Sequence, residues 1–304
     1  MQQEVGETVG VRCLEKLAAL VLLGGSVRAS RLSQTIGRSV LDLPVESGLS
    51  LLERWRDEAG RLALGNGLRR LAMRVMVDRD AAEPKVPVAH EHTIVSVERD
   101  PFEYRGTGGV LKDLSSDYAD DDYILVASAA QILLEDLTAM ATALGECESD
   151  VSLLAPHDGA PAGLMLIRCA ALRGISESGF VDLKEQALPA IGRTHRVEVV
   201  PWETSSALPV RNLTDYISAL RSHHLSRKGQ VEVNPYAEDW ESAFSLVEAG
   251  ANVAGDACVH DSVVLKDAKV EAGAVVVRSV VGPHGVVRKG QMVVEALVSG
   301  ERLA

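Results

Sequence analysis

Aromatic residues are scarce in this chain of 304 residues, at 4%, whereas 46% of the residues are hydrophobic. The core must therefore consist mainly of Val, Leu, Ala and Ile. The four cysteines lie far apart and form no Cys-x-x-Cys pair, which argues against common cysteine-based zinc and dithiol motifs; they are Cys13, Cys147, Cys169 and Cys258. This usage is typical of a reduced protein, and we expect a cytoplasmic location.

Long apolar runs and excess positive charge are also missing. No apolar run reaches about 18 residues, so we expect no membrane-spanning helix. Residues 1–10 begin with an acidic stretch, which predicts a polar extension and no signal peptide. The net charge of −12 argues against nucleic acid or an anionic membrane as the main partner.

Strand and helix patterns alternate through the first two thirds of the chain. Short apolar runs predict buried strands at 18–23, 71–77, 123–127, 151–155, 164–168 and 196–200. Amphipathic spacing predicts helices at 49–59, 108–118, 135–144, 182–191 and 214–221. This alternation predicts an α/β, Rossmann-like domain over residues 11–224, with a mixed, mostly parallel sheet covered by helices on both faces.

An apolar residue then returns about every six positions. The series runs Val247, Val253, Val259, Leu265, Val270, Val276, Val281, Val287 and Val293, with phase slips near 268–270 and 277–281. This period predicts a left-handed parallel β-helix of hexapeptide repeats over residues 247–304, with each aliphatic side chain pointing inward. So short a solenoid needs a cap or a partner. The alternative is a set of β-hairpins. Residues 225–246 form the expected linker.

The first strand runs directly into Gly24-Gly25, followed by a polar loop and Arg31-Leu32. Two glycines after a strand favour a sharp turn and a phosphate-facing loop, in which Gly24, Gly25, Ser26, Arg28 and Arg31 are nucleotide-binding candidates. The loop has no third glycine. The competing interpretation is a surface loop with two solvated arginines.

Three further segments complete a resemblance to a known family. They are Gly106-Thr107-Gly108-Gly109-Val110-Leu111, Gly179-Phe180-Val181-Asp182-Leu183-Lys184-Glu185-Gln186 and Leu41-Asp42-Leu43-Pro44-Val45. In this order, and with the hexapeptide tail, the chain resembles the sugar-1-phosphate nucleotidyltransferases, most like the mannose-1-phosphate guanylyltransferase group. The resemblance adds Gly106, Thr107, Gly108 and Gly109 as nucleotide-binding candidates, and Gly163, Asp182 and Glu185 as candidates on the sugar side.

The family joins a sugar phosphate to the α-phosphate of a nucleoside triphosphate and releases pyrophosphate. That chemistry needs a cation beside the phosphates and carboxylates that hold Mg²⁺. The resemblance places Val40 at the lysine position, and Ala130 and Pro209 at the two metal-binding aspartate positions. The family's sugar-phosphate arm corresponds to the short segment 156–161, which lacks a lysine. The resemblance therefore implies the fold without the catalytic groups.

Other polar clusters carry weaker alternatives. Asp120, Asp121 and Asp122 precede a predicted strand and fit a solvated turn. His90 and His92 suggest a metal ligand pair, but the sequence offers no third ligand. His223-His224 fits the end of a helix. His260 and His284 lie in solenoid turns, where a hexapeptide acyltransferase would carry its base.

Three functions remain open. The first is a nucleotidyltransferase-like protein with lost or strongly reduced catalysis, which binds a nucleotide or nucleotide-sugar as a regulatory or scaffolding subunit. It would pair with itself or an active relative through the β-helix, with no cofactor. The second is an active sugar-1-phosphate nucleotidyltransferase with rearranged ligands, which would need Mg²⁺. The third is a hexapeptide acyltransferase.

Overall fold

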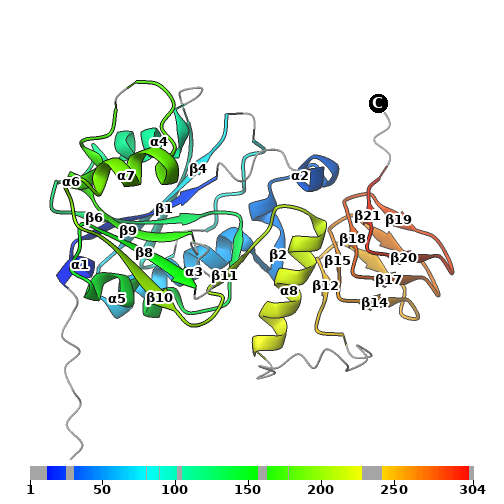
Figure 1. The fold of residues 1–304 in the computed structure, drawn as a ribbon. Coiled ribbons are helices and arrows are strands. Elements are labelled where there is room, and N and C mark those ends of the chain that lie inside the picture. Colours follow the sequence, from blue (N-terminus) through cyan, green and yellow to red (C-terminus); the bar gives the residue numbers. More distant parts are fainter. Residues whose placement is uncertain are drawn as a thin grey trace, which may run out of the picture.

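A computed structural model gives the fold in two parts, an α/β layer structure and a smaller C-terminal stack of short strands (Figure 1). The structure describes residues 12–24, 31–79, 81–88, 90–100, 105–156, 163–176, 178–227 and 242–300. The predicted extension 1–10 lies outside these residues, as do most of the expected linker and the last four residues.

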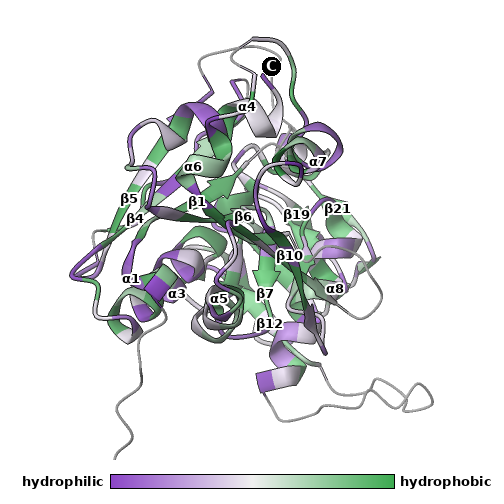
Figure 2. Ribbon diagram, turned by 60° about the vertical axis from the view of Figure 1, so that its left-hand side comes forward, coloured by the Kyte–Doolittle hydropathy of each residue, from purple (hydrophilic) through white to green (hydrophobic). Residues whose placement is uncertain are grey.

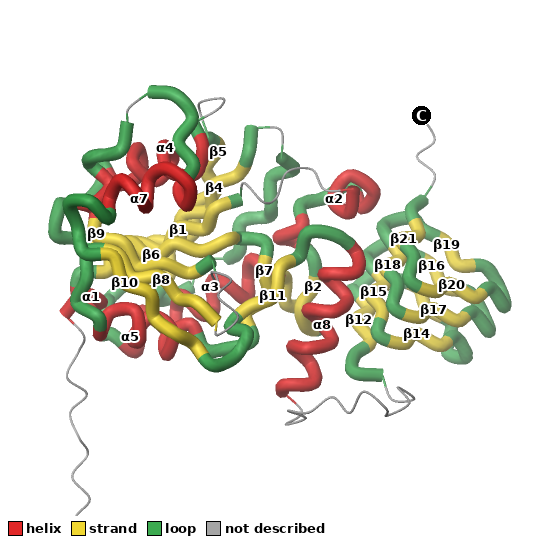
Figure 3. Tube along the Cα trace, in the orientation of Figure 1, coloured by secondary structure: helices red, strands yellow, loops and turns green. Residues whose placement is uncertain are grey.

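A seven-stranded sheet in the order β10-β8-β9-β6-β1-β4-β5 forms the centre of the first part (Figure 3). Its strands are β1 (Leu17–Leu23), β4 (Leu71–Val77), β5 (Thr93–Arg99), β6 (Tyr123–Ser128), β8 (Val151–Pro156), β9 (Leu164–Arg168) and β10 (Val197–Trp202). β9 runs antiparallel to β6 and β8, and the other neighbours pair in parallel. The predicted mixed α/β sheet is confirmed.

Helices cover both faces of this sheet. One face carries α1 (Arg12–Glu15), α3 (Leu51–Gly65) and α5 (Leu137–Glu146). The other carries α4 (Gly106–Ser115), α6 (Cys169–Leu172), the π-type turn η3 (Leu183–Ala187) and α7 (Leu188–Ile191). In β1, Leu20 and Leu22 face the first layer, whereas Ala19 and Val21 face the second. The strand is apolar throughout because both of its faces are buried, and the central strands are green in Figure 2.

Short elements connect this sheet to the C-terminal part. They are α2 (Arg31–Ile36), the 3₁₀ turn η2 (Val40–Asp42), the hairpin β2 (Pro44–Glu46) with β3 (Leu49–Ser50), and α8 (Leu213–Arg227). A further antiparallel pair joins β7 (Gln131–Leu133) to β11 (Ala207–Pro209). β5, β7 and β11 were not predicted from the sequence, and α8 extends six residues beyond the predicted helix end at Arg221.

The C-terminal strands alternate among three parallel sheets, in an arrangement compatible with a β-helix. The sheets are β12-β15-β18-β21, β13-β16-β19 and β14-β17-β20. The strands are β12 (Ser245–Val247), β13 (Asn252–Val253), β14 (Cys258–His260), β15 (Ser262–Val264), β16 (Lys269–Val270), β17 (Val275–Val277), β18 (Val280–Val281), β19 (Val286–Val287), β20 (Met292–Val294) and β21 (Leu297–Val298).

The coil in this stack has 17 residues, one fewer than three hexapeptides. Val263 pairs with Val280, and Val280 pairs with Leu297, each 17 positions on. Each coil therefore has one side of five residues, which accounts for the phase slips in the sequence. The prediction that Leu265 points into the stack is wrong, because Val264 fills that core while Leu265 joins the larger core of the α/β part.

The shortened corner is a single residue in the left-handed conformation. Asp261, Arg278 and Glu295 occupy it in successive coils, with φ of 43°, 44° and 49°. The serine after the corner bridges one coil to the next, since Ser262 Oγ accepts the N–H of Ser279 at 3.0 Å and Ser279 Oγ accepts that of Ala296 at 3.0 Å. Side-chain hydroxyls thus satisfy backbone donors that the tight corner leaves without a strand partner.

The two parts share one hydrophobic core. Side chains from α2, α8 and the sheet that contains β12 and β15 belong to the same buried cluster, among them Ile36, Tyr216 and Val263. Two ion pairs span the same boundary, from Arg38 to Glu248 at 2.6 Å and from Arg221 to Asp261. Because the boundary combines apolar packing with ion pairs, the C-terminal stack is docked against the α/β part and not merely tethered to it.

His223 near the end of α8 gives a pH-dependent prediction. Its ring is buried and its Nε2 lies 3.1 Å from Glu46 Oε1. Burial lowers the pKa of His223, although the Glu46 carboxylate acts in the opposite direction. The folded chain then binds fewer protons than the unfolded chain near pH 6, so stability is present above the ordinary histidine pKa of about 6.5 and falls as the pH decreases below it.

Urea unfolding at pH 7.5 and 5.5 should show a smaller pH dependence for His223→Gln than for the parent. An unchanged dependence would contradict this, and the partly exposed His195 provides the control substitution, His195→Gln.

Candidate functional site

The site expected for an α/β sheet lies where its connections switch faces. The chain passes from β1 to β4 through α3 on one face, and from β5 to β6 through α4 on the other. β1 and β6 are neighbours and end together, with Leu23 paired to Ser128. Ligands of such sheets bind beyond the carboxyl ends of the strands at this switch point, so the strand ends at Leu23 and Ser128 are the candidate site, called the switch-point site below.

Gly24 is the first residue beyond β1 at this point. Its N–H donates to Met76 O at 2.6 Å, and a Cβ built on Gly24 would lie 2.1 Å from the same oxygen. The glycine is therefore required for the close approach of β1 to β4, whatever the following loop binds. The candidates Gly25, Ser26 and Arg28 lie outside the described residues. Arg31 begins α2, and its side chain is also outside them.

The two positions expected for metal carboxylates lie side by side. Pro209 of β11 pairs with Gln131 of β7, and the N–H of Val210 donates to Ala130 O at 2.9 Å. The preceding residue is fixed as well, because Trp55 Nε1 donates to Ala129 O at 3.1 Å. The structure thus brings together two positions separated by 79 residues, at the carboxyl edge of the sheet, and neither side chain can ligate a cation.

Val40, at the position of the expected lysine, lies in η2 and is buried in the main core. The nearby carboxyl of Asp42 accepts the backbone N–H of Lys85 at 2.9 Å. Burial raises the pKa of Asp42, against the opposing effect of that hydrogen bond. The segment is thus fixed by apolar packing and one backbone contact, and Val40 offers no donor to a phosphate.

The Gly106–Gly109 segment packs against another part of the chain. Gly106 has φ of 68°, and a Cβ there would lie 2.4 Å from Val181 O. The N–H of Gly108 donates to that same oxygen at 2.9 Å, and Thr107 Oγ1 accepts the N–H of Leu183 at 3.2 Å. Close backbone packing by the 181–183 segment therefore accounts for Gly106, Thr107 and Gly108. A Cβ on Gly109 would meet Arg105 at 3.3 Å.

The candidates on the sugar side have separate surroundings. Asp182 caps η3 by accepting the N–H groups of Lys184 and Glu185, both at 2.8 Å, and the Glu185 side chain is exposed. Gly163 precedes β9 with φ of 72°, and a Cβ there would lie 3.6 Å from Gln131 Oε1 and 4.0 Å from Ser128 Cβ. Gly163 therefore lies beside the switch-point site, whereas Asp182 has a capping role.

Gln131 is a polar residue beside Gly163 that the sequence did not single out. It is 7% exposed, and its Nε2 has no hydrogen-bond partner among the described residues. A glutamine within the apolar run of β7 was the available signal. The Asp120–Asp122 turn, by contrast, precedes β6 at the opposite edge of the sheet, where Arg173 pairs with Asp120 at 2.9 Å and Arg168 pairs with Asp121.

The described residues contain no cluster of three or more His, Cys, Asp or Glu arranged to hold a metal ion. Within the same residues, no helix combines the length and apolar character needed to cross a bilayer. Comparison of the chain with protein-family models gives no match, and comparison with curated proteins gives none. The function must therefore be argued from the geometry.

Proposed function

We propose that this protein is a nucleotidyltransferase-like binding subunit that has lost the phosphoryl-transfer reaction and carries a left-handed β-helix as its C-terminal domain. The observation that carries this is the pairing of Ala130 and Pro209 at the carboxyl edge of the sheet. In the sugar-1-phosphate nucleotidyltransferases that the chain resembles, these two positions would carry the carboxylates that bind Mg²⁺. Ala130 and Pro209 keep the two backbone segments adjacent, but their methyl and pyrrolidine groups cannot bind a metal ion. This combination fits a scaffold that was retained while its metal ligands were lost.

The topology of the switch-point site supports binding. The site lies where β1 and β6 end side by side, and small residues such as Gly163 and Ser128 lie next to these strand ends. Gln131 supplies an amide beside Gly163. A neutral donor–acceptor group of this kind suits a nucleotide base or a sugar hydroxyl better than a phosphate that requires charge neutralisation. The ligand class is therefore a nucleotide or a nucleotide-sugar, bound without transfer.

A turnover assay tests the loss of catalysis. With each nucleoside triphosphate, Mg²⁺ and mannose-, glucose- or N-acetylglucosamine-1-phosphate, we expect no pyrophosphate release above the enzyme-free blank. The reason is that, among the described residues, Val40, Ala130 and Pro209 offer no cation or metal ligand to stabilise the charge developing on the phosphates. An active sugar-1-phosphate nucleotidyltransferase assayed in parallel is the positive control. Robust turnover would replace this proposal with that of an active enzyme.

Binding is tested separately by calorimetry against nucleotides and nucleotide-sugars. Ser128→Leu places a larger side chain at the switch point and should weaken binding by at least about tenfold, since it obstructs the switch-point site. The matched control Ser116→Leu lies at the exposed end of α4 and should leave binding unchanged. Absence of binding by the parent chain, or equal affinity of the two variants, would overturn the proposed site.

A further inference from the structure

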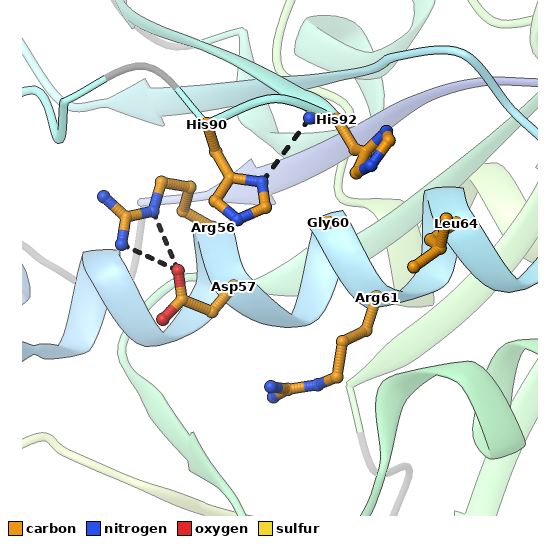
Figure 4. Close-up of a pocket in the computed structure, with 7 residues that line it drawn as sticks. All are labelled: Arg56, Asp57, Gly60, Arg61, Leu64, His90 and His92. Carbon is orange, nitrogen blue, oxygen red and sulfur yellow. Dashed lines mark hydrogen bonds and ion pairs between the residues drawn. The ribbon is translucent and has the colours of Figure 1, made fainter.

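A cavity lies beside the turn that leads into β5, at the amino-terminal end of that strand. It has a volume of about 430 Å³ and opens between α3 and the turn that leads into β5 (Figure 4). Its walls are Arg56, Asp57, Gly60, Arg61 and Leu64 from the helix, and His90 and His92 from the turn. Because β1, β4, β5 and β6 run in parallel, the His90–His92 turn, which precedes β5, lies at the end of the sheet opposite the switch point.

The two arginines of the cavity are held by carboxylates of their own helix. Arg56 donates to Asp57 Oδ1 from Nε at 2.9 Å and from Nη2 at 2.7 Å, and its Nη1 reaches Val88 O at 3.2 Å. Arg61 pairs through Nη2 with the buried Glu58 at 2.5 Å. Glu58 is also neutralised from its other side by Arg54 at 2.8 Å. Fixed guanidinium groups lose little further freedom when they bind an anion.

The lining carries excess positive charge. Two arginines stand against one aspartate among the lining residues, and Glu58, which pairs with Arg61, lies outside the lining. The chain as a whole carries a net charge of −12, so this local excess departs from the character of the molecule. Leu64 at the margin is one of the most exposed large apolar side chains among the described residues. The cavity thus combines cations with an apolar contact.

Backbone contacts fix the ring of His90. Its Nδ1 accepts the N–H of His92 at 3.4 Å, so the neutral ring carries its proton on Nε2, where it can donate to a ligand. The turn itself is anchored, because Leu71 N–H donates to His92 O at 2.9 Å and Thr93 N–H to His90 O at 3.3 Å. Figure 4 shows the His90 ring over Gly60 of α3.

Gly60 allows the His90 ring to lie against the helix. A Cβ on Gly60 would lie 3.0 Å from both Cε1 and Nδ1 of His90, closer than ordinary contact. Glycine inside a helix costs about 1 kcal/mol relative to alanine. The close packing of the His90 ring against α3 explains why a glycine occupies position 60. The same packing places hydrogen-bond donors of the turn and of the helix around one cavity.

From this arrangement we infer that the cavity binds the phosphate group of a small phosphate ester, at a site distinct from the switch-point site. Donors face it from two walls, and a tetrahedral phosphate presents oxygens to both, whereas a planar carboxylate presents its two oxygens in one plane. The cavity is larger than a phosphate ion, so an organic group is expected beside it, in contact with Leu64. Arg61 and His90 are the residues expected to touch the phosphate.

The test uses the full chain and two probes, inorganic phosphate and phenyl phosphate, with benzoate as the carboxylate comparison. Long-range ¹H–¹⁵N spectra of the imidazoles report directly on His90 and His92. Titration with either phosphate should shift the resonances of these two histidines, and phenyl phosphate should bind more tightly than phosphate. Arg61→Gln should weaken phenyl phosphate binding by about tenfold, as expected for one charge-assisted hydrogen bond.

Arg193→Gln is the matched control, because it removes one exposed arginine charge after α7 on the other face of the sheet. If Arg61→Gln fails to fold, His90→Gln takes its place with the same expected loss. Unmoved His90 and His92 resonances at about 10 mM phenyl phosphate, an affinity near the limit of useful binding, would overturn the inference. So would equal affinity of Arg61→Gln and Arg193→Gln, or tighter binding of benzoate than of phenyl phosphate.

Discussion

Replacement of Asp261 by Asn should cost about 3 kcal/mol of unfolding free energy, one of the two largest effects expected in this chain. The Asp261 side chain is fully buried, and its Oδ1 accepts the N–H groups of Ala243 at 2.6 Å and Phe244 at 3.2 Å. Its Oδ2 pairs with Arg221 of α8. Loss of one partner of a buried ion pair typically costs about 3–5 kcal/mol because the other charge stays buried. Asn retains the left-handed backbone preference, so the change reports on the charge.

Urea unfolding measures this effect, and Asp267→Asn is the matched control. Asp267 also occupies a left-handed corner of the C-terminal stack, with φ of 65°, but it is exposed. Its substitution should change the unfolding free energy by less than about 0.5 kcal/mol, as is usual at exposed positions. A cost below about 1 kcal/mol for Asp261→Asn would show that the carboxylate does not hold the C-terminal stack to α8.

Gly106→Ala should be similarly destabilising, by about 3 kcal/mol, because two costs combine at this position. A non-glycine residue in the left-handed region costs about 1–2 kcal/mol. The new Cβ would in addition lie 2.4 Å from Val181 O, and such overpacking costs about 1–3 kcal/mol. Thermal and urea unfolding of the variant measure the sum.

Gly67→Ala separates the two costs. Gly67 has nearly the same φ, 66° against 68° at Gly106, but a Cβ there would meet no atom within 4 Å. Gly67→Ala should therefore lower the unfolding free energy only by the cost of the left-handed backbone conformation, about 1 kcal/mol. Equal losses at both positions would show that the 181–183 segment moves away without cost. In that case packing would not explain the glycine, and a ligand-binding role for the Gly-Thr-Gly-Gly segment would regain support.

The sequence predicted much of the central sheet because strand burial is a local signal. The runs at 71–77 and 164–168 match β4 and β9 at both ends. β5 was not predicted, since it is an edge strand of mixed polarity that begins after the His90–His92 turn. The antiparallel pair β7–β11 was not predicted either, because its three-residue strands are stabilised by pairing across 74 or more residues and not by any local pattern.

The sequence likewise predicted only part of the candidate site. The resemblance identified Ala130 and Pro209 as positions without carboxylates, but only the fold could show that they lie together. The glycines at positions 24 and 106 suggested phosphate loops, whereas the structure shows backbone oxygens of Met76 and Val181 where their Cβ atoms would be. A glycine in a sequence reports that something approaches closely, and it does not identify what approaches.

The mostly parallel α/β sheet and the apolar period of the C-terminal stack could be predicted from the residues alone, because both follow from which side chains must avoid water. Three features became evident only in the folded chain: the 17-residue coil, the docking of Asp261 on Arg221, and the pairing of α3 with the His90–His92 turn around a cavity. These features depend on distances between segments far apart in the chain. Such distances are set when the elements pack, since no local pattern carries them.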